Sequence, residues 1–107
     1  MFVRNKDRDS RKMLPGVELK TLVHGDVTLL AEFRLKKGSS IPSHSHPQEQ
    51  TGYLVRGKIR LEIGDETFDV EPGDGWCVKG GESHGAEAVE DSLVVEIFSP
   101  PREDYLS

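Results

Sequence analysis

The chain has 107 residues, of which 35% are hydrophobic and 31% are charged, and its formal net charge is −5 at pH 7. A chain of this length forms one domain with a modest core, and no apolar stretch approaches the roughly 20 residues of a membrane-spanning helix. The acidic balance argues against nucleic acid or an anionic membrane as the main partner.

The first twelve residues are polar and carry charges of both signs, so we expect residues 1–12 to form a flexible or edge-pairing arm. They lack the apolar segment of a signal peptide, and the single cysteine, Cys77, leaves no internal disulfide. Both features favour a cytoplasmic protein. Cys77 lies between Trp76 and Val78, which predicts a small buried side chain rather than a reactive thiol.

In residues 13–107, short apolar segments alternate with turn sequences, a pattern typical of an all-β sandwich or barrel. The expected strands in chain order are 17–23, 27–35, 50–55, 58–63, 67–70, 76–78, 84–89 and 92–98. Gly64-Asp65 has the length of a tight hairpin turn between two of them. A C-terminal tail follows at 99–107, and its segment 101–106 is the most helix-like piece, one turn that begins at a proline.

The histidines point to a metal site. His44 and His46 are two residues apart, and residues with this spacing in a strand face the same side. Gln50 follows at even spacing, and His84 begins a later strand after a glycine-rich turn. Three imidazoles and one side-chain oxygen can form an open site for a transition metal. The alternative is a set of surface histidines, which is what we expect of His24 in its turn.

The spacing around these histidines resembles the two sequence motifs of the cupins. The first runs over 38–57 as glycine, five residues, His-x-His, three residues, Gln50, six residues and glycine. The second runs over 73–84 and ends at His84. The resemblance implies a cupin jelly-roll, a double-stranded β-barrel, and one divalent transition metal (Ni, Zn, Fe or Mn) held by His44, His46, Gln50 and His84.

Three positions depart from the cupin motifs. Gln50 stands where glutamate is usual, Lys79 replaces a proline, and Ala88 replaces an asparagine. The glutamine matters most, because four neutral ligands leave the full charge of the ion and favour an anionic substrate or an acidic bound water. Glu49 has the opposite strand parity to Gln50, so we expect it to face away from the site.

The last expected strand places Glu96 among apolar residues. If Val94, Glu96 and Phe98 face inward, a carboxylate enters the barrel beside the metal; the opposite parity would place Val95 and Ile97 in the core instead. The cupin resemblance favours the inward parity.

Arg102 follows a stiff diproline at 100–101. It can fold over the barrel mouth and grip a carboxylate with two hydrogen bonds, or it can pair in solvent with Glu103 or Asp104. Tyr53 and Trp76 can wall the pocket and stack on a sugar, or they can pack in the core or in an interface.

The segments His-Ser-His-Pro-x-Glu-Gln, Gly-Tyr-Leu-Val and the terminal Phe-Ser-Pro-Pro-Arg-Glu-Asp-Tyr-Leu are similar to small cupins related to the pectin-degradation protein KdgF. This resemblance implies ring opening of unsaturated uronate monomers to the linear 4-deoxy-5-keto-uronate. It makes Glu96 and Arg102 catalytic and Phe98 and Arg102 substrate-binding. Glu96 stands where that family usually has aspartate, and the extra methylene shifts the proton-transfer group.

Three functions stay open from the sequence: a uronate ring-opening enzyme, a cupin oxygenase with a three-histidine metal centre, and a non-catalytic sugar- or metal-binding module. The expected partner is a small anionic sugar, with no nucleic acid and no membrane. We also expect a homodimer, because a chain of this size gains from added burial.

Overall fold

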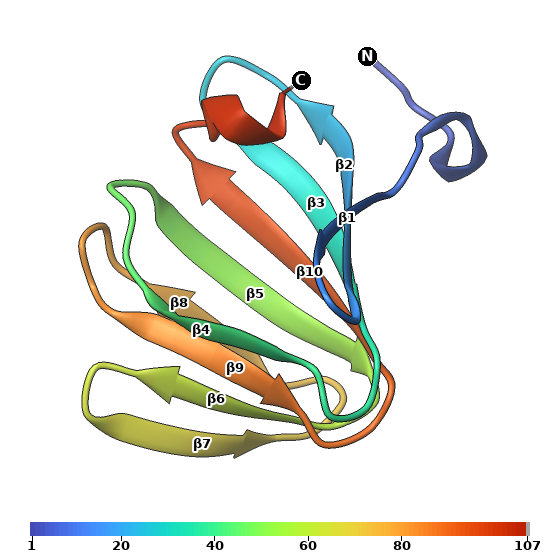
Figure 1. The fold of residues 1–107 in the computed structure, drawn as a ribbon. Coiled ribbons are helices and arrows are strands. Elements are labelled where there is room, and N and C mark those ends of the chain that lie inside the picture. Colours follow the sequence, from blue (N-terminus) through green and yellow to red (C-terminus); the bar gives the residue numbers. More distant parts are fainter. Residues whose placement is uncertain (107) are drawn as a thin grey trace.

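The computed structural model describes residues 1–106 and consists of two antiparallel sheets packed face to face (Figure 1). The six-stranded sheet has the order β1-β2-β3-β10-β5-β8, and the four-stranded sheet has the order β4-β9-β6-β7. The strand bounds are β1 Arg11–Leu14, β2 Val17–His24, β3 Leu29–Leu35, β4 Ser40–His44, β5 Glu49–Arg56, β6 Ile59–Ile63, β7 Glu66–Val70, β8 Gly75–Val78, β9 His84–Ala88 and β10 Ser92–Ser99. The all-β jelly-roll prediction is confirmed, as an open sandwich rather than a closed barrel.

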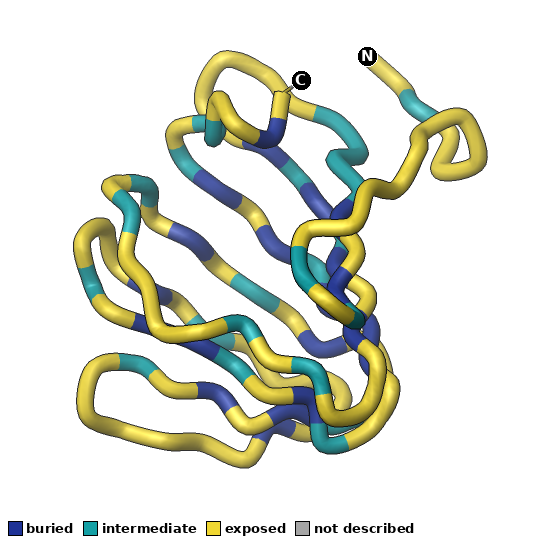
Figure 2. The backbone as a smooth tube through the Cα atoms, in the orientation of Figure 1, coloured by how far each residue is buried: buried dark blue, intermediate teal, exposed yellow. Residues whose placement is uncertain are grey.

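Apolar side chains at alternate positions fill the space between the sheets. Figure 2 shows this alternation as bands of buried and exposed residues along the strands. In β3 the buried side chains are Leu29, Ala31, Phe33 and Leu35, and the residues between them are more accessible. A strand with this period buries one face against the other sheet and leaves the other face to solvent.

All eight strands expected from the sequence are present, and two more, β1 and β4, were not expected. Three of the four residues of β1 are exposed, and β4 contains a proline and is mostly exposed. Both lie at the edge of a sheet, where little burial constrains the sequence and a proline is tolerated. The segment expected at 27–35 begins only at Leu29, because Val27 lies in the preceding turn.

Cys77 lies on the outer face of β8 and is exposed, so the prediction of a buried thiol is wrong. Its neighbours Trp76 and Val78 are the residues of β8 that turn inward, to half-buried and buried positions. Period-two alternation therefore sends the cysteine between them outward. An apolar run of three residues does not reveal this parity.

The two terminal segments meet at one end of the sandwich. The 3-10 turn η1 (Asn5–Asp7) lies outside the sheets, and the 3-10 turn η2 (Glu103–Tyr105) lies at one end of the six-stranded sheet, beside β10, β3 and β2 (Figure 1). Arg11 donates a hydrogen bond to the carbonyl of Asp104, and the Thr21 hydroxyl donates one of 2.7 Å to the carbonyl of Tyr105. The described residues contain no helix long and apolar enough to cross a membrane.

Candidate metal centre

Three histidines converge at one end of the four-stranded sheet. His44 ends β4, His84 begins β9, and these two residues are paired across the two strands. His46 lies in the loop after β4, so it does not share a strand with His44 as the sequence suggested. The three imidazoles nevertheless offer donor atoms that all lie within 4.8 Å of one another.

Two loops hold these histidines together. The backbone N–H of Gly81 donates a hydrogen bond of 2.8 Å to the carbonyl of His46. Gly80 passes so close to Pro47 that a Cβ at this position would lie 2.3 Å from the Pro47 carbonyl oxygen. The glycines before His84 therefore allow the second loop to pack against the first.

Backbone carbonyls fix the tautomer of all three rings. The Nδ1 atoms of His44, His46 and His84 each lie within hydrogen-bond distance of a carbonyl two residues away, at 2.8, 3.0 and 2.9 Å. A carbonyl only accepts, so each Nδ1 carries the proton and each Nε2 presents a lone pair to the cluster. The buried Nε2 of His84 has no hydrogen-bond partner among the described residues.

Gln50 adds an oxygen to this cluster. Its Nε2 donates a 2.8 Å hydrogen bond to Glu96 Oε2, which turns its Oε1 to within 2.8 Å of His46 Nε2. In the tautomer that the Gln48 carbonyl selects, His46 Nε2 is an acceptor, so it faces a second acceptor. A cation satisfies both atoms at once, and the orphaned Nε2 of His84 needs one as well. The four residues therefore fit a metal.

The electrostatics favour neutral imidazoles. Burial lowers the pKa of His46, and the nearby Arg102 charge lowers it further. Burial also lowers the pKa of His84, with only part of that effect offset by the Glu82 carbonyl. Because a metal binds the neutral form of histidine, both shifts favour metal binding at neutral pH.

Glu96 brings a carboxyl to the same place from β10. Its side chain is only 7% exposed, whereas Ile97 is 41% exposed, so the inward parity expected from the cupin resemblance is the one observed. Burial raises the pKa of Glu96 to about 8, although the Gln50 hydrogen bond acts in the opposite direction. The adjacent Trp76 indole also lowers this pKa, but its buried Nε1 does not reach hydrogen-bond geometry with any described residue.

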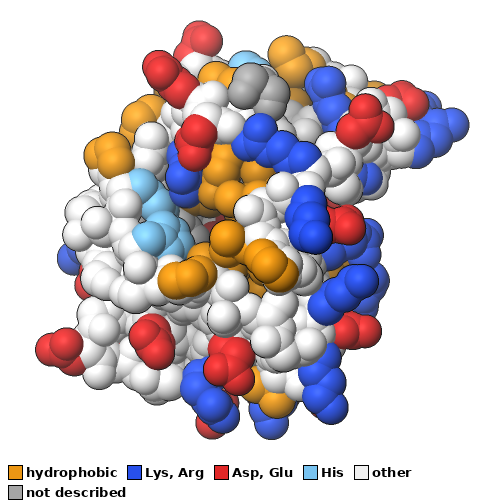
Figure 3. Space-filling model, viewed as in Figure 1, with side chains coloured by type: hydrophobic (Ala, Val, Ile, Leu, Met, Phe, Trp, Pro, Cys, Tyr) orange, Lys and Arg blue, Asp and Glu red, His pale blue; other side chains and the backbone are white. Residues whose placement is uncertain are grey.

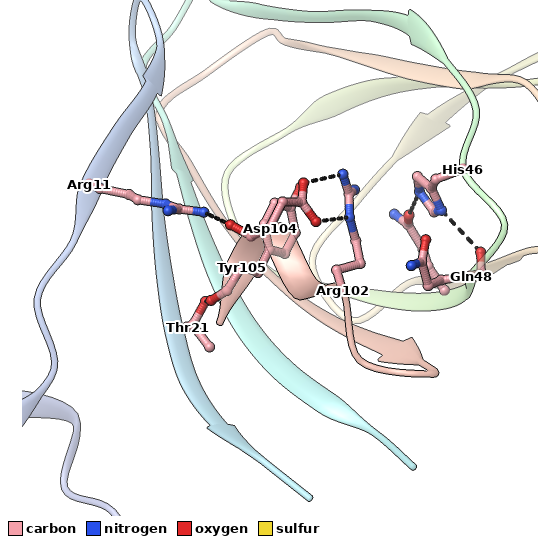
Figure 4. Close-up of polar contacts among 8 residues, drawn as sticks. Arg11, Thr21, His46, Gln48, Arg102, Asp104 and Tyr105 are labelled. Atoms are coloured by element: carbon pink, nitrogen blue, oxygen red, sulfur yellow. Dashed lines mark hydrogen bonds and ion pairs between the residues drawn. The ribbon is translucent and has the colours of Figure 1, made fainter. Parts of the chain in front are cut away.

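Arg102 lines the cavity and pairs with Asp104, one of the two alternatives left by the sequence, while its binding of a ligand carboxylate stays a prediction. Its Nη2 and Nε bond the two Asp104 carboxylate oxygens at 2.8 and 3.2 Å (Figure 4). The guanidinium also lies 4.1 Å from the Tyr105 ring centre and 5.5 Å from that of Phe98. No described residue bonds Nη1, so one end of the guanidinium is available to a ligand carboxylate.

These groups surround a cavity of about 360 Å³ between the two sheets. Its polar lining comes mainly from His44, His84, Gln50, Glu96 and Arg102, and much of the remaining lining is apolar. Figure 3 shows the histidines beside a cluster of hydrophobic side chains in a hollow on this face. The volume suits a small ligand.

The sequence-predicted aromatics fall in different places. Phe98 is fully buried in the cavity wall, with its ring 5.8 Å from that of His46. Trp76 also lines the cavity and lies over Gly52, where a Cβ would approach the indole to 2.2 Å. Tyr53 is 50% exposed on the outer face of β5, so the prediction that it walls the pocket is wrong. Its parity is opposite to that of Gln50.

Two residues of this site are not predicted by the sequence analysis. Asp104 holds Arg102, and Tyr105 stacks on Arg102 while its ring contacts Phe33 and Phe98. The sequence predicts Asp104 only as a solvent-exposed partner of Arg102. The position of Tyr105, three residues after Arg102 and therefore one 3-10 turn further along, was the available signal.

Comparison with known proteins agrees with this geometry. Residues 31–99 match the family model of the cupin domain (Cupin_2), and the chain belongs to the cupin family. The fold superimposes on the structure of KdgF from Halomonas sp. with a TM-score of 0.94 and 32% identity, covering 99% of this chain and 100% of that one.

Two curated relatives are also similar. Pectin degradation protein KdgF of Dickeya dadantii is 27% identical over 93 residues, which cover 85% of this chain and 84% of that protein. H2HPP isomerase of Bacillus subtilis is 32% identical over 95 residues, but this chain spans only 40% of its length. The chain is thus a small cupin that resembles KdgF.

Proposed function

We propose that this cupin is a metal-dependent enzyme that opens the ring of unsaturated uronate monomers to give the linear 4-deoxy-5-keto-uronate. The observation that carries the proposal is the continuous set of contacts from His46 through Gln50 to Glu96, with Arg102 held over the same cavity. The similarity to KdgF over the whole length of the Halomonas protein supports the same reaction.

The residues that would hold the metal are His44, His46, Gln50 and His84. Their neutral nitrogen and oxygen donors suit a divalent transition ion such as Ni, Zn, Fe or Mn. When bound, such an ion supplies Lewis-acid stabilisation of negative charge on a substrate oxygen. We propose that residues of this chain perform the remaining steps of binding and proton transfer.

Arg102 binds the uronate carboxylate with the end of the guanidinium that Asp104 leaves unpaired. In the reaction the bond between the anomeric carbon and the ring oxygen breaks, the anomeric hydroxyl loses its proton, and the enol carbon C4 gains one. Glu96 moves this proton, since it is the buried carboxyl of the cavity and can accept or release a proton near neutral pH. Phe98 and Trp76 keep the cavity around Glu96 apolar.

We further propose that the chain works as a homodimer in the cytoplasm. The support for the dimer is an apolar strip on the outer face of the six-stranded sheet, formed by Tyr53, Val55 and Ile97 of β5 and β10. The support for the location is the single cysteine, Cys77, which leaves no internal disulfide.

The decisive experiment follows the conjugated ultraviolet absorbance of unsaturated galacturonate. Metal-loaded protein, chelated protein and buffer are compared, because the ring also opens unaided. We expect loss of absorbance above the buffer rate, abolished by chelation and in His46→Ala, with His24→Ala as a surface control that stays active. A rate equal to buffer with metal bound would overturn the proposal; oxygen uptake would then favour an oxygenase, and binding without turnover a non-catalytic module.

A further inference from the structure

The rim of the cavity is not uniformly polar. Met13 and Leu14 of β1 and Ile41 of β4 line the cavity and are partly exposed, so they form part of its mouth. Met13 is 37% exposed, so its side chain is accessible from solvent at this rim. We refer to Met13, Leu14 and Ile41 as the apolar wall.

The backbone presents this wall through two irregularities. The pairing of β1 with β2 shifts register between Lys12 and Leu14, and the pairing of β4 with β9 shifts between Ile41 and His44. Such bulges turn side chains away from the regular strand pattern and are frequent beside active sites. Met13 lies within the first shift, and Ile41 adjoins the second.

A fully hydroxylated sugar would find few partners along this wall. The nearby Ser43 hydroxyl is engaged with Ser83 at 2.7 Å, and the Gln50 amide is engaged with Glu96. A hydroxyl buried against Met13, Leu14 and Ile41 would lose its hydrogen bonds to water without replacement. The wall therefore suits a part of the ligand that has no hydroxyl.

We propose that the apolar wall determines specificity, by accepting the hydroxyl-free edge of a carboxylate whose charged end binds Arg102. This proposal rests on the proposed function for the position of the carboxylate. An unsaturated uronate has such an edge at C4, where no hydroxyl is present, whereas galacturonate carries a hydroxyl there. The site thus prefers carboxylates with an apolar edge over fully hydroxylated uronates.

The test measures binding by calorimetry to metal-loaded full-length protein, with phenylacetate and galacturonate as probes. We expect phenylacetate to bind roughly ten- to a hundredfold more tightly than galacturonate. Ile41→Thr and Met13→Gln should each reduce this ratio severalfold. Ile41→Val keeps the wall apolar and should preserve the ratio, as should Val27→Thr, whose side chain is 67% exposed and outside the cavity.

Three results would each overturn the proposal that the apolar wall determines specificity. They are equal binding of the two probes, no binding of phenylacetate, and an unchanged affinity ratio in both Ile41→Thr and Met13→Gln. Thermal unfolding of each variant identifies any variant that fails to fold. Valine and threonine have nearly the same volume, so Ile41→Val and Ile41→Thr differ mainly in the polarity of the side chain. Calorimetry requires no turnover, so the proposal that the wall determines specificity and the proposal of ring opening can be tested independently. A protein that opens the ring but shows no preference between probes would retain only the proposed function.

Discussion

Glu96 occupies a position in which its neutral form is favoured. Its pKa is raised from 4.5 to about 8 by burial, so the folded protein binds more protons than the unfolded chain between these pH values. Stability from this group is therefore greatest below pH 4.5 and falls as pH rises toward 8. Glu96→Gln cannot ionise, and its amide oxygen can still accept the hydrogen bond from Gln50.

We predict that this substitution removes a pH-dependent loss on the order of 2–4 kcal/mol in the free energy of unfolding, since one pKa unit is worth about 1.4 kcal/mol. Urea unfolding of chelated protein at pH 5 and pH 8 measures it, as the difference between wild type and variant. The same variant should lose at least about a hundredfold in kcat. If the free energy of unfolding depends on pH in the same way in both proteins, Glu96 is not a buried, protonated carboxyl.

Asp104 is a positioning residue for Arg102. Its two hydrogen bonds fix the guanidinium between the Phe98 and Tyr105 rings, with one end left for a ligand. We predict that Asp104→Asn raises KM about three- to tenfold and changes kcat by less than about twofold, because carboxylate binding loosens while the proton-transfer group is untouched. The exposed neighbour Glu103 serves as the control, as Glu103→Gln. A fall in kcat at constant KM would contradict this role.

At the scale of elements, β5 and β8 determine how Trp76 faces the cavity. Gly52 leaves the space that the indole occupies, since a Cβ there would lie 2.2 Å from a ring atom. We predict that Gly52→Ala destabilises the protein by about 1–3 kcal/mol and shifts the fluorescence of Trp76, the single tryptophan. Gly25→Ala is the matched control, because no atom lies within 4 Å of its added Cβ. Urea unfolding measures both, and equal stabilities would show that the indole moves freely.

The elements also show what the sequence can predict. Clean alternation identified β6, because a half-buried strand has a strong period-two pattern, whereas β3 and β10 were identified as apolar, β-rich runs. The run of β10 left both parities of Glu96 open, and the cupin resemblance selected the inward one. Edge strands β1 and β4 bury too little for such a pattern. The errors at Tyr53 and Cys77 are errors of parity in segments whose two faces are both partly apolar.

The sequence predicts the candidate metal ligands of the site, but it does not predict several residues at the mouth of the cavity. His44, His46, Gln50 and His84 have a motif spacing that survives even though His46 leaves the strand. Asp104 and the apolar wall have no such spacing, since their roles depend on how the chain termini and two register shifts meet at the cavity mouth.

At the scale of the whole molecule, the outer face of the six-stranded sheet is where we expect a second copy to bind. Tyr53 of β5 is paired with Val95 of β10, and Ile97 and Val55 lie on the same two strands. Tyrosine and aliphatic side chains on a sheet face suit a twofold interface, because each patch can pack on its own copy. The cavity lies on the inner side of this sheet, so a dimer formed through the outer face would leave it accessible.

We predict a dimer in size-exclusion chromatography with light scattering at micromolar concentrations. A charge at the centre of an apolar interface is strongly disfavoured, so Tyr53→Lys should give a monomer. Phe68→Lys is the control, since Phe68 is an exposed aromatic on β7 of the other sheet and should leave the dimer intact. A monomeric wild type would exclude the dimer, whereas a dimer that persists in Tyr53→Lys would move the interface to another face. If Tyr53→Lys yields a monomer that still opens the ring, the contacts from His46 to Glu96 act within one chain, as their position between the two sheets requires.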